Sequence, residues 1–156
     1  YVGRTFIKPT QKQRDEAVQL KLNVVTELIR DKRIVVVDDS IVRGTTTRGK
    51  MQQLRRAGAK EIHLRISCPP TISPCYYGID TPRRSELIAS SHSVEDIREY
   101  LNADSLSYLS LEGMLSSVGL RARSYCTSCF TGKYPVEFPR DEDAYLQLAL
   151  KLPNNL

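Results

Sequence analysis

The 156-residue sequence has no apolar run long enough to span a lipid bilayer. Its first residues, Tyr1 to Arg4, provide neither the apolar core nor the cleavage site of a secretory signal peptide. These absences predict a cytoplasmic protein without a membrane partner. The chain also lacks an initiator methionine, and we expect it to be part of a longer protein.

Basic tracts and catalytic histidine constellations are missing as well. The formal net charge is +5, but the basic residues are interleaved with acids. The densest basic groups are only pairs: Lys32-Arg33, Arg55-Arg56 and Arg83-Arg84. Scattered pairs are typical of a solvated surface, so the sequence predicts no nucleic-acid partner. The two histidines, His63 and His92, have no evident catalytic partner, and we assign them no catalytic role.

The composition and the order of the expected elements favour an α/β fold. Hydrophobic residues make up 40% and charged residues 26% of the chain, which is ordinary for one globular domain. Strand and helix patterns alternate, which predicts a mainly parallel sheet with flanking helices and a ligand beyond the carboxyl ends of its strands. The expected strands are 34–37, 61–67, 76–79 and 105–109, and the expected helices are 10–30, 47–57, 93–101, 110–118 and 141–152.

The most informative stretch runs from Ile34 to Thr47. The β-branched run Ile34 to Val37 is typical of a central parallel strand that is buried on both faces. Asp38 and Asp39 close it, and because adjacent carboxylates repel each other, they indicate a nearby cation, polyol or basic group. Gly44 and three threonines then open a helix whose N–H groups can bind phosphate. Together these features predict a site for a sugar phosphate with Mg²⁺.

Three alternatives compete for this stretch. Gly44 to Lys50 fits the nucleotide-binding pattern G-x-x-x-x-G-K, but Met51 stands where that pattern needs a hydroxyl for Mg²⁺. A receiver domain also carries an acidic pair after a strand, but Arg-Gly-Thr-Thr-Thr should not follow that pair. A solvated acidic turn before an ordinary helix explains Asp39 and Thr45 separately, but not their combination.

The four cysteines fall into unequal groups. Cys126 and Cys129 form a C-x-x-C pair, which suits a metal, an iron–sulfur cluster or a redox pair, and Cys75 stands apart after a proline. A thioredoxin-type site is disfavoured because the pair does not open a helix after a strand. Two unlinked thiols in a reducing cytosol remain an alternative. Cys68 is expected to be a small buried thiol.

Residues 35–47, Val-Val-Val-Asp-Asp-Ser-Ile-Val-Arg-Gly-Thr-Thr-Thr, resemble the phosphoribosyl-pyrophosphate (PRPP) binding motif of type I phosphoribosyltransferases. A longer match resembles the glutamine-dependent members of that family, and it adds segments 1–7, 78–80, 86–89 and 130–135. The resemblance covers nearly the whole chain. It implies a type I phosphoribosyltransferase fold that is incomplete at its N-terminus. Residues 1–120 would form the later half of the transferase domain, and 121–156 a cysteine-bearing loop with a C-terminal helix.

The same resemblance implies a site and a reaction. Asp38 and Asp39 would engage the ribose hydroxyls and Mg²⁺, and Arg4 would belong to a mobile loop that closes over PRPP. The residues implied in PRPP binding are Asp38, Asp39, Ser40, Arg43, Gly44, Thr45, Thr46 and Thr47. Ammonia from a separate glutaminase domain would replace pyrophosphate and give 5-phosphoribosylamine, the first intermediate of purine synthesis. Another PRPP-dependent transferase, or a PRPP-sensing regulator without catalysis, remains an alternative.

Further cofactors and partners follow from the resemblance. Cys75, Cys126 and Cys129 match three thiolate ligands of a [4Fe–4S] cluster whose fourth ligand would lie outside this chain. Purine nucleotides are expected as feedback inhibitors, and a homo-oligomer is expected as the assembly.

Overall fold

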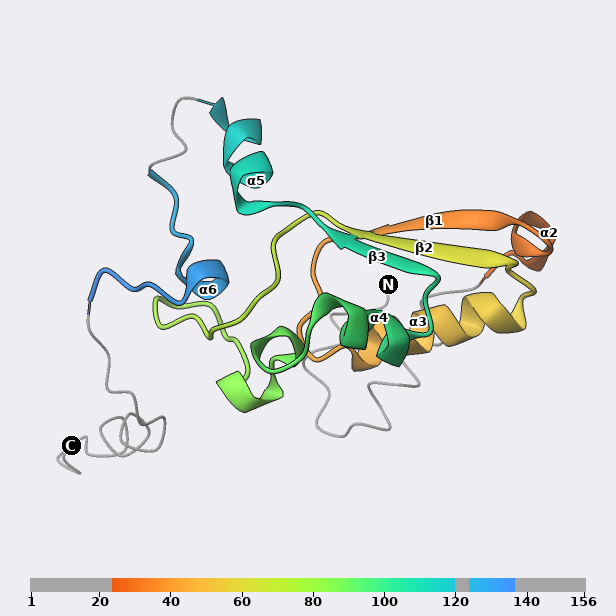
Figure 1. Cartoon of the computed structure of the whole chain (residues 1–156), viewed down its shortest axis with the longest axis horizontal. Coiled ribbons are helices and arrows are strands. Elements are labelled where there is room, and N and C mark those ends of the chain that lie inside the picture. The colour runs from red at the N-terminus through yellow and green to blue at the C-terminus, as the bar shows by residue number, and fades with distance from the viewer. Residues whose placement is uncertain (1–23, 120–123, 137–156) are drawn as a thin grey trace, which may run out of the picture.

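The computed structural model describes residues 24–119 and 124–136, and its centre is a parallel sheet (Figure 1). In these residues the sheet has three strands in the order β1-β2-β3: β1 is Arg33–Asp38, β2 is Glu61–Ile66 and β3 is Ser105–Tyr108. Val36 pairs with Leu64, and Leu64 pairs with Leu106, so one face carries apolar side chains from all three strands. The predicted α/β fold with a parallel sheet is confirmed.

Short helices connect the strands, and most begin where the sequence predicts. Ser93 caps α4 (Val94–Leu101) by accepting from the Asp96 N–H, and Ser110 caps α5 (Leu111–Ser117) in the same way from Gly113. α4 ends at Asn102, whose φ of 57° suits a left-handed C-cap. The other helices in the part of the chain that the structure describes are α2 (Thr26–Ile29), α3 (Thr45–Arg56) and α6 (Ser128–Thr131), with single 3₁₀ turns η2 (Arg84–Glu86) and η3 (Ile88–Ser90).

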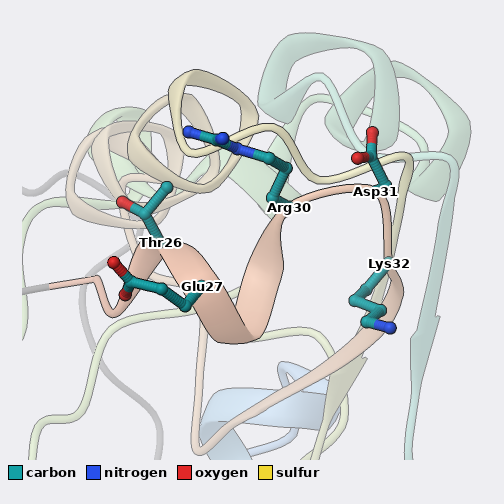
Figure 2. A pocket seen from close by; sticks show the side chains of 5 residues that line it. All are labelled: Thr26, Glu27, Arg30, Asp31 and Lys32. Atoms are coloured by element: carbon teal, nitrogen blue, oxygen red, sulfur yellow. The ribbon is translucent and has the colours of Figure 1, made fainter.

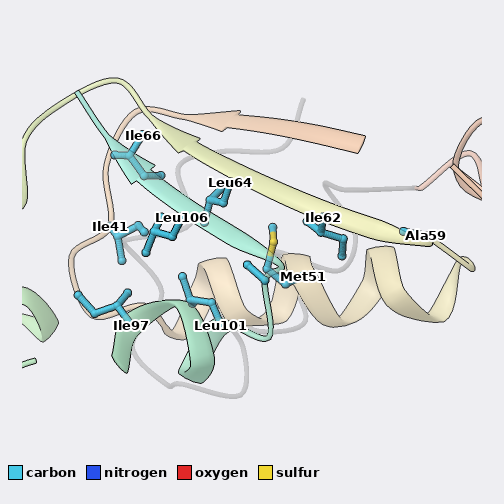
Figure 3. Packing of buried hydrophobic residues seen from close by; sticks show 10 residues of the cluster. Ile41, Met51, Ala59, Ile62, Leu64, Ile66, Ile97, Leu101 and Leu106 are labelled. Carbon is cyan, nitrogen blue, oxygen red and sulfur yellow. The ribbon is translucent and has the colours of Figure 1, made fainter. Parts of the chain in front are cut away.

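α3 and α4 cover one face of the sheet and form the core with it (Figure 3). Met51 of α3, Leu64 of β2 and Leu101 of α4 are all 0% exposed. Each such side chain contributes about 1.5–3 kcal/mol by leaving water. The cluster comprises Ile41, Met51, Ala59, Ile62, Leu64, Ile66, Ile97, Leu101, Ala103 and Leu106. It fixes the position of α3 against the carboxyl end of β1.

The opposite face corrects one prediction. Val35 and Val37 are 64% and 71% exposed, although the β-branched run from Ile34 to Val37 was expected to be buried on both faces. In the described residues β1 has only β2 as a neighbour, and the helices of the core lie on the face of Ile34 and Val36. The run therefore alternates between half-buried and exposed positions, as an edge strand covered on one side does.

Three other predictions differ from the structure. The segment expected as a cysteine-bearing loop contains the short helix α6, which includes Cys129. Residues 76–79 form no strand, because the Cys75 N–H donates to Thr81 Oγ1 and the Tyr77 N–H donates to Cys75 Sγ instead of to a neighbouring strand. The expected unbroken helix 10–30 is also wrong, since Val25 is extended and α2 begins at Thr26. Two adjacent β-branched residues, Val24 and Val25, favour that extended backbone.

Some predictions fall on segments that the structure does not describe. The start of helix 10–30, helix 141–152 and the Arg4 loop lie there. Among the described residues, no helix has the length and apolarity to cross a membrane.

Candidate functional site

The acidic pair lies at the carboxyl end of β1, and its two members have different surroundings. Asp38 lies on the helix-covered face, in register with Ile66, and its Oδ2 accepts from Lys50 Nζ at 2.7 Å. Asp39 is exposed, and its Oδ1 accepts from the Ser40 N–H at 2.8 Å. The other Asp39 carboxylate oxygen has no hydrogen-bond donor in the described part of the chain. One acid is therefore paired with a cation, and the other is open to a ligand.

The turn after the pair presents the amino end of α3. Gly44 has φ 76°, and a Cβ there would lie 3.1 Å from Ile88 Cδ1 and 3.2 Å from Tyr100 Cε1. Both the backbone angle and the close packing therefore require glycine. Because Gly44 has no side chain to cap the helix, the first N–H groups of α3 are left for water or a ligand. The Thr45 and Thr46 side chains are exposed beside them, while Thr47 is buried. This arrangement suits an anion.

The turn at residues 41–44, called the phosphate turn below, is held in place by residues outside the predicted motif. The Arg43 guanidinium forms a 2.7 Å ion pair with Glu86, and the Ile88 N–H donates to the Val42 carbonyl at 3.0 Å. The Arg43 hydrogen bond lowers the pKa of Glu86 below its ordinary value, so this carboxylate stays charged. Arg48 of α3 stacks over the Tyr100 ring at 4.6 Å from its centroid. These contacts connect the turn and the start of α3 to η2, η3 and α4.

Sequence reasoning missed three contributors to this site: Lys50, Glu86 and Tyr100. Lys50 drew attention only for its place in the nucleotide-binding pattern, and its 12-residue separation from Asp38 fits no short-range rule. Glu86 lies in a segment that the resemblance included, but no role was predicted for it. The predicted residues 38–47 do come together at one end of the sheet.

The cysteines lie on two segments that the structure brings together. The Cys129 carbonyl accepts from the N–H groups of Ile72 and Ser73 at 3.0 and 3.1 Å. Tyr134 Oη donates to the Pro74 carbonyl at 2.5 Å, next to Cys75. Burial raises the pKa of the Cys129 thiol, and the neighbouring Cys75 and Cys126 raise it further. As arranged, the described residues form no group of three or more His, Cys, Asp or Glu side chains that could hold a metal.

Cys68 is near enough to Asp39 and to Cys129 for both to affect its pKa. Burial raises its pKa to about 11, with the charges of Asp39 and Cys129 adding to the effect. Burial also raises the pKa of Tyr108 to about 12, and its hydroxyl is buried without a hydrogen-bond partner in the described residues. The half-buried Cys68 is consistent with a packed thiol that stays protonated.

A polar pocket lies at the opposite end of β1 (Figure 2). It has a volume of about 270 Å³ and is lined by Thr26, Glu27, Arg30, Asp31 and Lys32. Ligands of parallel sheets bind beyond the carboxyl ends of the strands, and this pocket lies before the start of β1. We assign it no ligand.

Comparison with known proteins agrees with the geometry. No family model matches the chain. The amidophosphoribosyltransferase of Archaeoglobus fulgidus is 56% identical over 144 residues, which cover 91% of this chain and 32% of that protein. The Bacillus subtilis enzyme is 54% identical over 148 residues, covering 90% of this chain and 30% of the relative. The chain thus spans about a third of the length of the curated relatives it matches.

Solved structures give the same result. The glutamine PRPP amidotransferase from Bacillus subtilis complexed with ADP and GMP matches with a TM-score of 0.72 and 54% identity, covering 90% of this chain and 32% of that one. A second structure, of the allosteric regulatory enzyme of purine biosynthesis, also has a TM-score of 0.72, with 50% identity over 90% of this chain and 31% of its own. These likenesses confirm the type I phosphoribosyltransferase fold. The chain is a segment of a phosphoribosyltransferase domain, and it belongs to the amidophosphoribosyltransferase family.

Proposed function

We propose that the carboxyl end of β1 and the amino end of α3 bind PRPP for the transfer of its phosphoribosyl group to ammonia. The observation that carries this proposal is the open amino end of α3, where Gly44 leaves the N–H groups uncapped beside two exposed threonine hydroxyls. α4 and α5, by contrast, are capped by Ser93 and Ser110. An uncapped helix start next to an unpaired carboxylate suits a ligand that carries both phosphate and hydroxyl groups.

In the proposed complex the two ends of the ligand bind different groups. The N–H groups at the start of α3 and the exposed hydroxyls of Thr45 and Thr46 bind the 5-phosphate. Asp38 and Asp39 accept hydrogen bonds from the ribose hydroxyls. Ser40 continues this turn, its N–H being held by Asp39. Arg43 acts by fastening the turn to Glu86. Fixing both ends of the sugar leaves C1 free for attack by ammonia as the bond to pyrophosphate breaks.

The acidic pair fits a Mg²⁺ ion that arrives on the pyrophosphate. Asp39 offers an unpartnered oxygen, whereas Asp38 Oδ2 is already bonded to Lys50, so the pair does not form a ready two-carboxylate chelate. Mg²⁺ commonly takes only one or two protein carboxylates and completes its shell with water and phosphate. When bound, the ion would neutralise the leaving pyrophosphate.

The nucleotide-binding alternative receives no support from the geometry. Lys50 is engaged by Asp38, and Met51 is fully buried in the core where the hydroxyl of that pattern would stand. ATP hydrolysis is therefore not expected. The Bacillus subtilis relative was solved with ADP and GMP, and we propose that purine nucleotides compete with PRPP here. A Lys50-dependent ATPase rate would contradict this assignment.

Cys75, Cys126 and Cys129 are proposed as three ligands of a [4Fe–4S] cluster. The support is their placement on two segments joined by the Cys129 carbonyl, although the present arrangement is not a closed metal site. The cluster would be structural, because the transfer needs no electron carrier. Full-length protein purified without oxygen should contain iron and acid-labile sulfide at about four each per chain. Zinc, or no metal, would contradict the proposal.

Three further features remain predictions. The Arg4 loop and the domain boundary at residue 120 are two of them. The cytoplasmic location is the third, because the relatives include chloroplastic enzymes.

The transfer activity can be tested without a glutaminase step. With ammonium chloride as the nitrogen source, the full-length protein should release pyrophosphate from PRPP in the presence of Mg²⁺. The Asp38→Asn, Asp39→Asn double variant should lose about a hundredfold or more of this rate, because the ribose and the leaving group lose their charged contacts. Asp80→Asn, at an exposed aspartate outside the site, is the control. An unchanged rate in the double variant would contradict the proposed site.

A further inference from the structure

The contact between Lys50 and Asp38 is the feature of the site that the proposed reaction does not itself require. Lys50 lies in the second turn of α3, and its side chain reaches across to the end of β1. Nζ is 2.7 Å from Asp38 Oδ2, and the two side chains are only 28% and 20% exposed. The pair is therefore partly shielded from water and from salt.

This contact makes the two neighbouring acids unequal in charge. Asp38 is neutralised by a cation within the protein, and its remaining oxygen, Oδ1, has only a 3.3 Å contact from the Asp39 N–H. Asp39 is exposed and has no cationic partner among the described residues. Without Lys50, two adjacent carboxylates would share one strand end with nothing to balance them, which is an arrangement that attracts a divalent cation.

We propose that Lys50 is a positioning residue that takes the place of a protein-bound metal at Asp38, so that the free site does not hold a divalent cation and the metal enters only with its anionic ligand. Lys50 also keeps Asp38 Oδ1 directed at the ribose hydroxyls. The inference rests on the proposed PRPP site and deepens it, because it assigns the cation requirement of that site to one residue outside the binding motif.

A purely structural ion pair between α3 and β1 would make a different prediction. It would affect stability, but it would not change the affinity of the ligand-free protein for metal. Mn²⁺ binding without PRPP, followed by electron paramagnetic resonance, is therefore the discriminating readout. The variants are Lys50→Met, Lys50→Gln, Lys50→Arg and the double variant Asp38→Asn, Lys50→Met. Lys60→Met is the matched control. It removes the same charge from an exposed lysine directly before β2.

Removing the lysine charge should increase Mn²⁺ affinity. An opposite charge within hydrogen-bond distance changes a carboxylate's affinity for a cation by about tenfold or more, so Lys50→Met and Lys50→Gln should bind Mn²⁺ at least about tenfold more tightly than the unmodified protein. Lys50→Arg and Lys60→Met should bind as the unmodified protein does. The double variant should lose the gain, because the Asp38 charge is gone.

Two results separate this inference from the proposed function. If PRPP binds but neither Lys50→Met nor Lys50→Gln gains Mn²⁺ affinity, the role of Lys50 is wrong and the PRPP site stands. If both variants gain Mn²⁺ affinity but the unmodified protein does not bind PRPP, the Lys50 assignment stands as a charge effect and the proposed function fails. Lys50→Gln keeps a hydrogen-bond donor of similar length, so it decides the question even if Lys50→Met does not fold.

Discussion

The phosphate turn and the cysteine-bearing segments lie in one chain, but different forces hold them. The turn rests on apolar packing, since Ile41 at its start and Met51 of α3 are at most 1% exposed, and the ion pair of Arg43 with Glu86 adds to it. The cysteine segments are joined by main-chain hydrogen bonds to Cys129 and by the Tyr134 contacts with Pro74 and the Tyr76 ring, 5.0 Å away. Packing of a continuous core tolerates the loss of one polar contact, whereas a few directed bonds do not. We therefore expect the proposed PRPP site to be preorganised and the thiols to depend on their local contacts.

The largest effect should come from the core beneath the phosphate turn. Leu64→Ala should lower the free energy of unfolding by about 2–5 kcal/mol, because Leu64 is 0% exposed and its loss leaves a cavity between β2 and α3. Val37→Ala, at a 71% exposed position of the same sheet, should cost less than about 1 kcal/mol. Urea unfolding of the two variants of this 156-residue chain measures the difference. Equal losses would mean that the bare face of the sheet is covered.

The next effect concerns the turn itself. Gly44→Ala should cost about 1–3 kcal/mol, because alanine is strained at φ 76° and its Cβ would crowd Ile88 and Tyr100. PRPP affinity should fall with it. Gly49→Ala, five residues later in α3 with open space around its Cβ, should instead stabilise the helix by up to about 1 kcal/mol. Thermal unfolding and PRPP titration of both variants test this pair, and a tolerant Gly44 would show that the turn is not preorganised.

The hydrogen bonds of Asp104, directly before β3, should contribute less to the free energy of unfolding. Asp104 Oδ2 accepts from the Ile62 N–H at 2.6 Å and from Arg55 at 2.5 Å, and these bonds, the Ile62 bond foremost, lower the pKa of Asp104 below its ordinary 3.8. Asp104→Asn should cost about 1 kcal/mol at pH 7, since the side chain is partly exposed.

The pH dependence of that cost has a defined sign. A lowered folded-state pKa stabilises the fold above pH 3.8, and the stabilisation is lost as the pH falls through the folded value. The difference between Asp104→Asn and the unmodified protein should therefore shrink in acid. Asp80→Asn, at an exposed carboxylate, is the control for general charge effects. If the difference in unfolding free energy stays constant down to low pH, the Asp104 hydrogen bonds do not depend on the charge of that carboxylate.

The smallest effect should appear in the cysteine segments. Tyr134→Phe removes the hydroxyl that donates to Pro74, worth about 1 kcal/mol, so the Ile72 and Ser73 amides should exchange hydrogen about fivefold faster. Tyr125→Phe, at a 54% exposed ring, should leave them unchanged. Exchange measured by NMR or mass spectrometry reports this directly. Unaltered protection in Tyr134→Phe would indicate that these segments share the stability of the core.

The same contrast explains what the sequence could predict. The end of β1, the Gly44 turn and the Ser93 and Ser110 caps follow from neighbouring residues, and these predictions are confirmed in position. Burial of Val35 and Val37 was wrong because burial depends on what covers a face, which lies far away in the sequence. The roles of Lys50 and Glu86 were not predicted for the same reason, since their partners are 12 and 43 residues away in the sequence.

The most direct test is calorimetric titration of the full-length protein with PRPP in the presence of Mg²⁺. Our account predicts one PRPP site per chain, with affinity that falls sharply in the Asp38→Asn, Asp39→Asn double variant while the melting temperature changes little. Those outcomes would place the ligand at the end of β1. Unchanged PRPP affinity in a folded double variant would contradict the account.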